Sequence, residues 1–390
     1  MKAFKLAFRN LIGAGLRTWL NVGILAFILI LMIFQYGIYD GWNRQAVTDM
    51  IAWEIGGGQI WQENYDPYDP FTLEDSHATI PASMQGEIEK GNLAPVLVTQ
   101  ATIYPDGRMQ SILLKGINPD QQVSDIPTAI LSGDYTEIPA VIGNIMAKNA
   151  KLKEGDLVTV RWRDVDGTFD ATEALIVGVF KADVPAVTAR QMWIPIERLR
   201  EMTQMSGQAT LLITDQEYIW YGSEEGWVMR DHDFLLKEMS EMIRMKKIGG
   251  SFIYVILLLL AMLAVFDTQV LSIFRRQKEI GTYMAMGMTR SQVVRLFTVE
   301  GAMHSILAVI VGTVPGIPLL MWINSKGIGM PGDYEEFGMA IAERIYPAYS
   351  AGLILSVMLI IIITTTIVSF LPSRKISKMN PVEAIKGKLQ

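Results

Sequence analysis

Four long apolar segments constrain this chain more than any other feature of its sequence. A helix needs about 20 mostly apolar residues to cross the roughly 30 Å hydrocarbon layer of a membrane. Segments of this kind occupy residues 19–39, 251–273, 297–323 and 348–371. The sequence therefore predicts an α-helical membrane protein with four transmembrane helices.

The distribution of charge predicts which side of the membrane each loop occupies. Segment 40–247 holds 32 acidic and 18 basic residues, a net charge of −14. Basic residues gather instead in three places, 1–18, 274–296 and 372–390. Because Lys and Arg near the helix ends stay on the cytoplasmic side, both termini and the 274–296 loop are expected in the cytoplasm. Segment 40–247 and the short loop 324–347 then face outward, although Arg244, Lys246 and Lys247 are basic residues on that outer side.

Segment 40–247 reads as a large α+β domain inserted between the first and second spans. Two β-rich pairs flank Pro105-Asp106-Gly107 and Asp166-Gly167, which are typical hairpin turns. Helical stalks are expected at Asp40–Glu54 and Asp233–Lys247, and Gly56-Gly57-Gly58 should join the first stalk to the sheet. Residues 1–18 have an apolar and a basic face at helical spacing, which predicts an amphipathic helix on the inner leaflet.

Few residues point to catalysis. The chain has no cysteine and three histidines without ligand spacing, so neither a zinc site nor any other metal or catalytic site is predicted. No GxxxxGK[ST] sequence occurs, so no nucleotide cofactor is expected in this chain. The acidic balance also gives no reason to expect nucleic acid as a partner.

The loop 274–296 carries the most specific pattern. Charged residues alternate there with small ones, which favours a helix-turn-helix that docks against another protein. The pattern comprises Arg275, Arg276, Lys278, Glu279, Ile280, Gly281, Ala285 and Gly287, followed by Phe297, Glu300 and Gly301. It resembles the R-x-x-E-I-G-x-x-x-A-x-G…F-x-x-E-G signature of MacB/FtsX-like permeases, the membrane subunits of one class of ABC transporter. The order of four spans, with the large domain after the first, is also similar to that family.

This resemblance implies how the chain would work. The eight residues from Arg275 to Gly287 would couple it to an ABC ATPase subunit, present in two copies, which would bind the ATP and Mg that this chain lacks. A second permease chain, identical or different, would complete the membrane dimer. The expected place is the inner (cytoplasmic) membrane of a bacterium, with the large domain in the periplasm.

Within the family, the sequence is most similar to the permeases of lipoprotein-releasing (Lol-type) systems. The resemblance rests on Gly226-Trp227, Phe234-Leu235 and the basic run that ends at Lys247. It implies extraction of lipoproteins from the outer leaflet, with transfer to a periplasmic carrier or adaptor. One of the Lol-type permeases has a long hook where this chain has only the short hairpin 161–172. The alternatives are a MacB-like efflux permease for amphiphilic compounds or peptides, and an FtsX-like signalling protein that controls a cell-wall hydrolase.

Several residues within the spans admit two interpretations. Ile30, Phe34, Phe252 and Ile256 either line a substrate cavity for acyl chains or pack the dimer. Gly312 and Gly316 form a GxxxG pair that predicts close packing of the third span against a neighbouring helix. Asp267, Glu300 and His304 are either interfacial groups with access to water, which the sequence favours, or parts of a proton relay.

Overall fold

The computed structural model describes residues 16–67, 69, 71–218, 220, 222, 224–329 and 344–378. It divides into a helical unit (Met1–Gly41, Met242–Ile328 and Tyr346–Gln390) and a sheet unit (Trp42–Glu241 and Gly329–Ile345). The amphipathic helix expected at 1–18 lies outside the described residues except for its last three. Most of loop 324–347 and of tail 372–390 also lies outside them.

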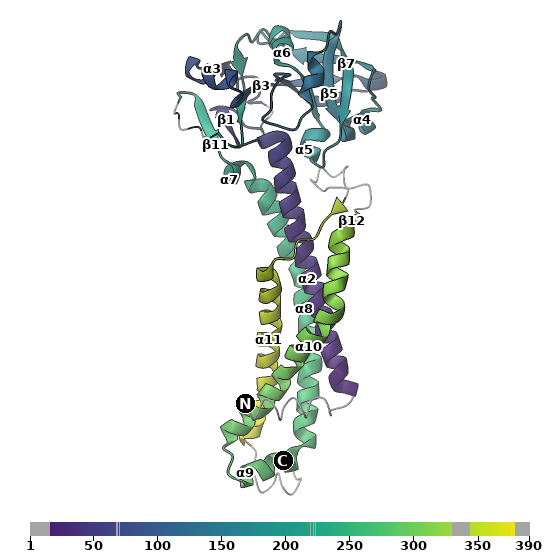
Figure 1. Ribbon diagram of the computed structural model, residues 1–390, viewed down its shortest axis with the longest axis vertical. Coiled ribbons are helices and arrows are strands. Elements are labelled where there is room, and N and C mark those ends of the chain that lie inside the picture. Colours follow the sequence, from purple (N-terminus) through teal and green to yellow (C-terminus); the bar gives the residue numbers. More distant parts are fainter. Residues whose placement is uncertain are drawn as a thin grey trace. The chain divides into compact units, whose positions relative to one another are not determined.

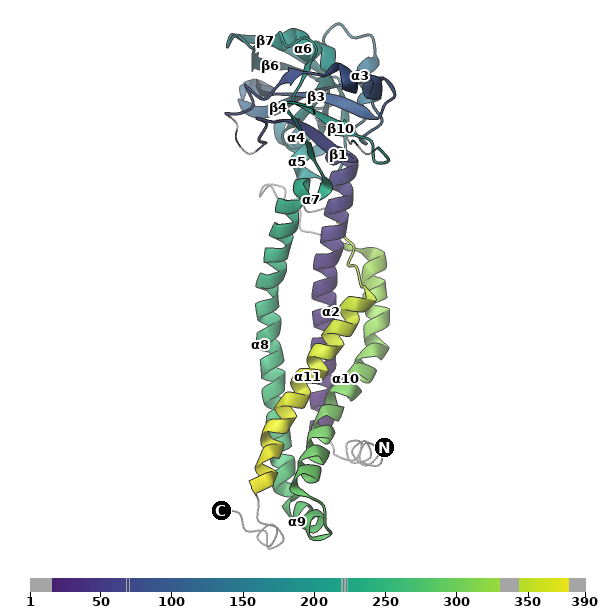
Figure 2. The same cartoon turned by 90° about the vertical axis from the view of Figure 1, so that its left-hand side faces the viewer.

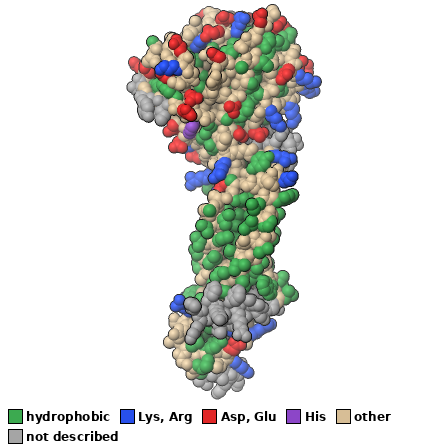
Figure 3. Space-filling view, viewed as in Figure 1, with side chains coloured by type: hydrophobic (Ala, Val, Ile, Leu, Met, Phe, Trp, Pro, Cys, Tyr) green, Lys and Arg blue, Asp and Glu red, His purple; other side chains and the backbone are tan. Residues whose placement is uncertain are grey.

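Four helices long and apolar enough to cross a membrane dominate the described part of the helical unit, which confirms the predicted fold class. Hydrophobic side chains cover most of the face of this unit that is visible in Figure 3. The helices are α2 (Leu16–Met50), α8 (Lys237–Arg275), α10 (Arg290–Lys326) and α11 (Ala351–Ser373), with a short α9 (Gln277–Ala285) and a 3₁₀ turn at Arg374–Lys378 (Figure 1).

Two spans begin at other residues than the apolar pattern indicates. α10 starts at Arg290, inside the segment expected to be loop, because Thr289 and Gln292 form a reciprocal capping box. α11 starts at Ala351 rather than 348, where the side chain of Ser350 accepts a hydrogen bond from the backbone of Leu353. Helix ends are thus set by polar caps, which hydropathy alone does not locate.

Polar side chains join α2 to α8 in an antiparallel pair. The sequence order of the contacts reverses from one helix to the other, so the two helices run side by side in opposite directions. Side-chain hydrogen bonds of 2.6–3.0 Å link Asn21 to Thr268, Gln35 to Tyr254, Tyr36 to Ser251, and Asp40 to Lys247. In lipid such interhelical bonds fix the register of two helices that apolar contacts would leave free to slide.

Small residues on α2 allow other segments to approach its backbone. A Cβ added at Gly37 would overlap the ring of Tyr349, and one at Gly41 would overlap the backbone of Tyr346. The backbone N–H of Ala348 donates to the carbonyl of Gly37 at 2.8 Å. The segment that enters α11 therefore crosses α2 at a GxxxG pair, Gly37 and Gly41, that the sequence analysis did not single out.

The sheet unit is built on a closed six-stranded barrel. Its strands pair in the order β3-β4-β8-β5-β7-β6, and β6 returns to pair with β3. The strands are β3 (Leu93–Ile103), β4 (Gln110–Ile117), β5 (Ile138–Gly143), β6 (Leu157–Arg163), β7 (Phe169–Phe180) and β8 (Gln191–Pro195). Figure 1 and Figure 2 show these strands from two sides. Closure removes the open edges through which a sheet can pair with other chains.

Three further strands extend the sheet from the first half of β3. In order outward they are β10 (Leu211–Thr214), β1 (Gly58–Gln62) and β11 (Trp227–Arg230), all antiparallel. A separate pair is formed by β2 (Ala78–Thr79) and β9 (Gln208–Ala209). Short strands β12 (Ile328–Gly329) and β13 (Arg344–Ile345) complete the described set.

Short helices connect these strands. They are α3 (Ala82–Glu89), α4 (Asn144–Ala150), α5 (Pro185–Thr188), α6 (Ile196–Thr203), α7 (His232–Leu235), and the 3₁₀ helices η2 (Pro105–Gly107) and η3 (Thr128–Ser132). A π-helical turn, η1 (Ile51–Ile55), continues α2. It ends at Gly56, whose φ of 62° suits glycine, and Gly57 donates to Thr214, so the triple glycine joins helix to sheet as predicted.

Alternating side chains on the strands fill two separate cores. On β3, Leu97 and Ala101 point into the barrel, whereas Val96 and Val98 belong to the core on the opposite face. β8 alternates in the same way, with Ile194 inside the barrel and Trp193 in the opposite core. Both faces of the barrel wall are therefore buried in these strands.

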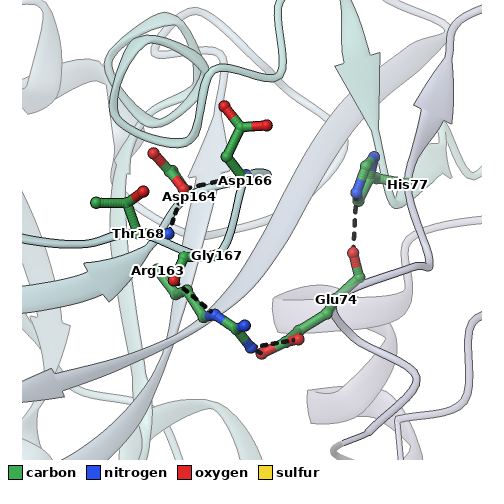
Figure 4. A network of polar contacts seen from close by, with 7 residues as sticks. All are labelled: Glu74, His77, Arg163, Asp164, Asp166, Gly167 and Thr168. Atoms are coloured by element: carbon green, nitrogen blue, oxygen red, sulfur yellow. Dashed lines mark hydrogen bonds and ion pairs between the residues drawn. The ribbon is translucent and has the colours of Figure 1, made fainter.

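Both predicted hairpins are confirmed, as β3–β4 and β6–β7. The tip of the second is held in place by polar contacts (Figure 4). Asp164 accepts from the backbone of Asp166 and Thr168, at 3.1 and 2.7 Å. Arg163 donates to the carbonyl of Gly167 and to both carboxylate oxygens of Glu74. The short hairpin is thus fastened to the segment before β2.

Replacement of one barrel leucine should destabilise the sheet unit. Leu114 is buried in the barrel core, so Leu114→Ala should cost about 2–5 kcal/mol and lower the thermal unfolding temperature of the purified chain. Leu157 on β6 is half exposed, so Leu157→Ala should change stability by less than about 0.5 kcal/mol. Equal unfolding temperatures for the two variants would contradict the barrel core described here.

Candidate coupling site

The predicted coupling loop forms a short helix held between two long ones. α8 ends at Arg275, α9 runs from Gln277 to Ala285, and α10 begins at Arg290 (Figure 2). The turn between α9 and α10 contains Gly287 with a φ of 94°, a conformation that glycine adopts without strain. The helix-turn-helix expected from the sequence is therefore present.

An apolar core fixes α9 against its neighbours. Ile280 on α9 is fully buried and packs in one cluster with Ile273 of α8, Phe297 of α10 and Ile376 beyond α11. Tyr283 and Met284 add partly buried contacts. Because this cluster includes residues from each surrounding element, α9 is packed on all of them.

Arg276 makes the strongest polar contacts of the site. Its guanidinium donates to Glu279 at 2.7 Å and to both carboxylate oxygens of Glu300 at 2.7 and 3.0 Å. The same group lies 4.9 Å from the ring centroid of Phe297. Burial alone would lower the pKa of Arg276, but the hydrogen bonds and charges of Glu279 and Glu300 raise it above its usual value. The Arg276 cluster, Arg276 with Glu279, Phe297 and Glu300, thus ties the start of α9 to α10 with a permanent charge.

These contacts correct the expectation that Glu300 and His304 have access to water. Glu300 is 8 % and His304 4 % exposed, and both face the interior of the helical unit. His304 Nδ1 lies 3.0 Å from the carbonyl oxygen of Gly301. Asp267, by contrast, is exposed on α8. Glu300 tolerates burial because Arg276 supplies its counter-charge.

The opposite face of α9 and of its turn is exposed. Met286 is 70 % exposed, and the exposed set around it comprises Arg275, Lys278, Glu279, Thr282, Ala285, Gly287, Thr289, Arg290 and Arg295. An exposed methionine flanked by Ala285 and Gly287 offers a flexible apolar contact that neighbouring side chains do not obstruct. We refer to this set as the α9 surface.

Of the eight residues predicted to couple, the structure separates two groups. Ile280 and Gly281 are buried, and Arg276 is mostly buried, so these residues hold α9 in place. Arg275, Lys278, Glu279, Ala285 and Gly287 lie on the α9 surface, where a partner can reach them. Their contact with an ATPase stays a prediction.

Gly301 is a position of close helix contact that the sequence did not explain. A Cβ added there would overlap Ser369 of α11 and would lie 2.6 Å from Gln269 of α8. Three long helices therefore meet at this glycine, one residue after Glu300. The F-x-x-E-G pattern thus combines three roles. Phe297 supplies the ring against Arg276, Glu300 supplies the counter-charge of Arg276, and Gly301 allows a close helix contact.

The remaining residues singled out within the spans are dispersed. A Cβ on Gly312 or Gly316 would come within 3.3 Å of Ala26 or 3.0 Å of Ile30, so α10 packs closely on α2 at these glycines. Phe34 is partly buried in the same helical core, whereas Phe252 and Ile256 are largely exposed on α8. Three cavities of the sheet unit are lined by other residues, and the binding of acyl chains by these four residues stays a prediction. Among the described residues, no group of three His, Cys, Asp or Glu side chains could hold a metal ion.

One family model matches the part of the chain that contains the site. Residues 251–381 match the family model described as FtsX-like permease C-terminal. Macrolide export ATP-binding/permease protein MacB of Burkholderia lata is 27 % identical over 160 residues, which are 39 % of this chain and 21 % of that protein. The chain thus spans about a fifth of the length of the first curated relatives it matches.

Other curated proteins similar to this chain include the following two. Pyoverdine export ATP-binding/permease protein PvdT of Pseudomonas aeruginosa is 27 % identical over 33 % of the chain and 17 % of its own length. An uncharacterized ABC transporter permease of Methanocaldococcus jannaschii is 26 % identical over 43 % of the chain and 39 % of its own length.

Solved structures also match, and one of them aligns with part of this chain. It is the extracellular domain of the noncanonic ABC-type transporter YknZ from Gram-positive bacteria, with 14 % identity and a TM-score of 0.29. The match covers 45 % of this chain and 99 % of that domain.

The ion pair between Arg276 and Glu300 should be visible as an energetic coupling. Arg276→Met leaves a buried carboxylate without its counter-charge and should cost about 3 kcal/mol of stability. The double variant Arg276→Met with Glu300→Leu removes both charges and should recover most of that loss. Thermal unfolding of the wild type, Arg276→Met, Glu300→Leu and the double variant in detergent measures the coupling. If the stability losses of the two single variants add up in the double variant, the pair does not form.

Gly301 should accept no side chain. Gly301→Leu forces α10 away from Ser369 and should lower stability by about 1–3 kcal/mol. Gly352 on α11 has no atom within 4 Å of an added Cβ, so Gly352→Leu is a matched control that should keep the wild-type unfolding temperature. A stable Gly301→Leu variant would contradict the close contact of α10 with α11.

Proposed function

We propose that this FtsX-like, MacB-family permease is the membrane subunit of an ABC transporter whose ATPase activity lies outside these 390 residues. In this proposal two ATPase subunits bind ATP and Mg and close on the α9 surfaces of two permease chains. The permeases convert that closure into movement of α2 and α8.

The observation that carries the proposal is the construction of α9. One face is locked to α8 and α10 by the Arg276 cluster and by the core around Ile280. The other face is free and includes exposed Met286. A helix that is rigidly held on one side and open on the other can receive force from a partner and pass it to the helices behind it.

Continuity of the long helices supports transmission of this force. α8 runs without a break from Lys237 to Arg275, and Arg276 follows it directly. α2 is tied to α8 by the polar contacts that end with Asp40 and Lys247. Displacement at α9 would therefore move the outer ends of both helices.

For the substrate we propose a lipoprotein taken from the outer leaflet of a bacterial inner membrane, with the large domain in the periplasm. The charge asymmetry supports this orientation. Exposed apolar side chains on α8, including Phe252 and Ile256, would suit contact with acyl chains or with a second permease chain. A periplasmic carrier or adaptor would receive the substrate.

Export of a smaller amphiphile is the second candidate. It is favoured by the names of the relatives, since MacB and PvdT are described as macrolide and pyoverdine export proteins. Such a transporter would work with an adaptor and an outer-membrane duct rather than release lipoproteins.

Purification from the native membrane in mild detergent separates these candidates. Copurification of an ATPase with acylated lipoproteins that leave on addition of ATP supports lipoprotein release. Copurification of an ATPase with an adaptor and a duct, without lipoproteins, would favour export. An ATPase with a cell-wall hydrolase and no transported molecule would overturn both in favour of signalling.

A charge on the α9 surface should uncouple the ATPase without unfolding the permease. Met286→Glu places a carboxylate at the exposed apolar contact and should reduce ATPase copurification by about tenfold or more. Met245 is 68 % exposed on α8, so Met245→Glu is a matched control that should retain the ATPase. Loss of the ATPase from both variants, or from neither, would contradict this docking surface.

A further inference from the structure

The sheet unit contains a cavity of about 530 Å³ that the proposed coupling does not use. This volume falls within the roughly 300–1,000 Å³ range of small-molecule sites. Much of its wall is aromatic or aliphatic and comes from η1, β1, β4, β8, β10 and α7. The apolar lining residues include Ile55, Trp61, Tyr65, Leu113, Trp193, Leu211, Ile213 and Phe234.

One part of this wall is charged and buried. Lys115 is 4 % exposed, and its ammonium donates to Glu54 Oε1 at 2.9 Å. Gln191 Nε2 donates to the same oxygen at 2.8 Å. The Lys115 ammonium also lies 4.9 Å from the ring centroid of Trp193. An ion pair in an apolar wall is costly to desolvate and is weak evidence for stability, so its presence beside a cavity calls for another reason.

Two polar atoms of residues that line the cavity beside this ion pair have no hydrogen-bond partner among the described residues. Trp193 Nε1 and Gln191 Oε1 are buried and have no partner among the described residues. Trp193 is fully buried and Gln191 is 3 % exposed, and both line the cavity. Lys115 carries three N–H groups and makes a single hydrogen bond to the described residues. Two N–H groups of Lys115, the N–H of Trp193 and the Gln191 oxygen are therefore available together beside the apolar wall, and buried groups of this kind normally have partners.

Exposed residues mark the mouth of the cavity. Ala186, Phe234, Lys237, Glu238 and Glu241 line it and are themselves exposed. Glu54 belongs to the π-helical turn η1, a rare geometry that is frequent at functional sites. The side chains of Lys115 and Glu54 are 5 % and 18 % exposed, so the charged pair is better shielded from solvent than the residues at the mouth.

We propose that this cavity binds an acyl chain through its amide or ester carbonyl. The carbonyl oxygen would accept hydrogen bonds from Lys115 Nζ and Trp193 Nε1, and an amide N–H would donate to Gln191 Oε1. The chain would lie against the aromatic and aliphatic wall, where each buried CH₂ contributes roughly 0.8 kcal/mol. A neutral headgroup is favoured over a carboxylate, because Glu54 already neutralises Lys115 and a second anion would be buried uncompensated.

This site deepens the proposed function, since an acyl chain is the part of a lipoprotein that such a cavity would hold. Binding requires neither the ATPase nor nucleotide. Its test can therefore use the permease chain alone, and its outcome is separable from that of the copurification experiment.

Photo-crosslinking of the full chain in lipid nanodiscs tests the proposal. The probe is palmitamide that carries a diazirine within its chain, and labelled peptides are identified by mass spectrometry. Labelling is expected on the peptides that contain β4 and β8, in addition to unspecific labelling of the membrane helices by probe dissolved in the bilayer. Labelling confined to the membrane helices would overturn the proposal.

A matched pair of tryptophan variants identifies the cavity. Ala186 is exposed and lines the mouth, so Ala186→Trp should reduce labelling of β4 and β8 by about tenfold without disturbing the core. Ala171 is exposed on β7 and does not line the cavity, so Ala171→Trp should label like the wild type. Equal labelling in the two variants would overturn the proposal.

A second variant tests the headgroup and does not depend on the first. Trp193→Phe keeps an aromatic ring but removes the indole N–H. Unlabelled palmitamide should then compete for β4 and β8 about fivefold less well, as expected for loss of one hydrogen bond, whereas competition by hexadecane should not change. Unchanged competition by palmitamide would overturn the assignment of the carbonyl to Trp193.

Discussion

A carboxylate that is buried away from water in a membrane protein needs a cation within hydrogen-bonding distance. Glu300 is such a carboxylate, and it imposes this requirement on the helical unit. Arg276 meets it with two hydrogen bonds. Since Arg276 stands between α8 and α9 while Glu300 is on α10, satisfying one charge fixes three helices. The position of α9, and with it the exposed surface that we assign to an ATPase, follows from this pair.

Two buried ion pairs among the described residues differ in their surroundings. The Arg276 guanidinium donates three hydrogen bonds, to Glu279 and Glu300, and lies over the ring of Phe297. Lys115 has Glu54 as its one hydrogen-bond partner among the described residues, and the neighbouring Trp193 N–H has none. The first pair joins α8 and α9 to α10, whereas the second lies beside a cavity with hydrogen-bonding groups that a ligand can use.

Sequence reasoning could predict those features that depend on local patterns. Apolar length gave the four spans, and the turns at Pro105-Asp106-Gly107 and Asp166-Gly167 gave both hairpins. Closure of the barrel could not be predicted, because the pairing of β6 with β3 joins residues about sixty positions apart without any local signal. Glu300 was wrongly expected to lie at an interface with access to water. Its burial could not be predicted from local pattern, because its counter-charge, Arg276, lies 24 residues away in sequence. The cavity at Lys115 was missed for the same reason, as its wall is assembled from residues far apart in sequence, between Met50 and Glu241.

Close backbone contacts explain how a small displacement at α9 could travel along the membrane helices. Gly301 brings α10 against α11 and α8, Gly312 and Gly316 bring it against α2, and Gly37 brings α2 against the entry to α11. At each of these positions an added Cβ would collide or nearly so, because the glycine lets a neighbouring element approach its backbone. The partner atoms belong to the backbone and Cβ of Ala26 at Gly312, and to side chains at Gly301, Gly316 and Gly37. α10 therefore packs closely on its neighbours from Gly301 to Gly316, starting one residue from the Arg276 cluster, and close packing of this kind is what a force-transmitting helix requires.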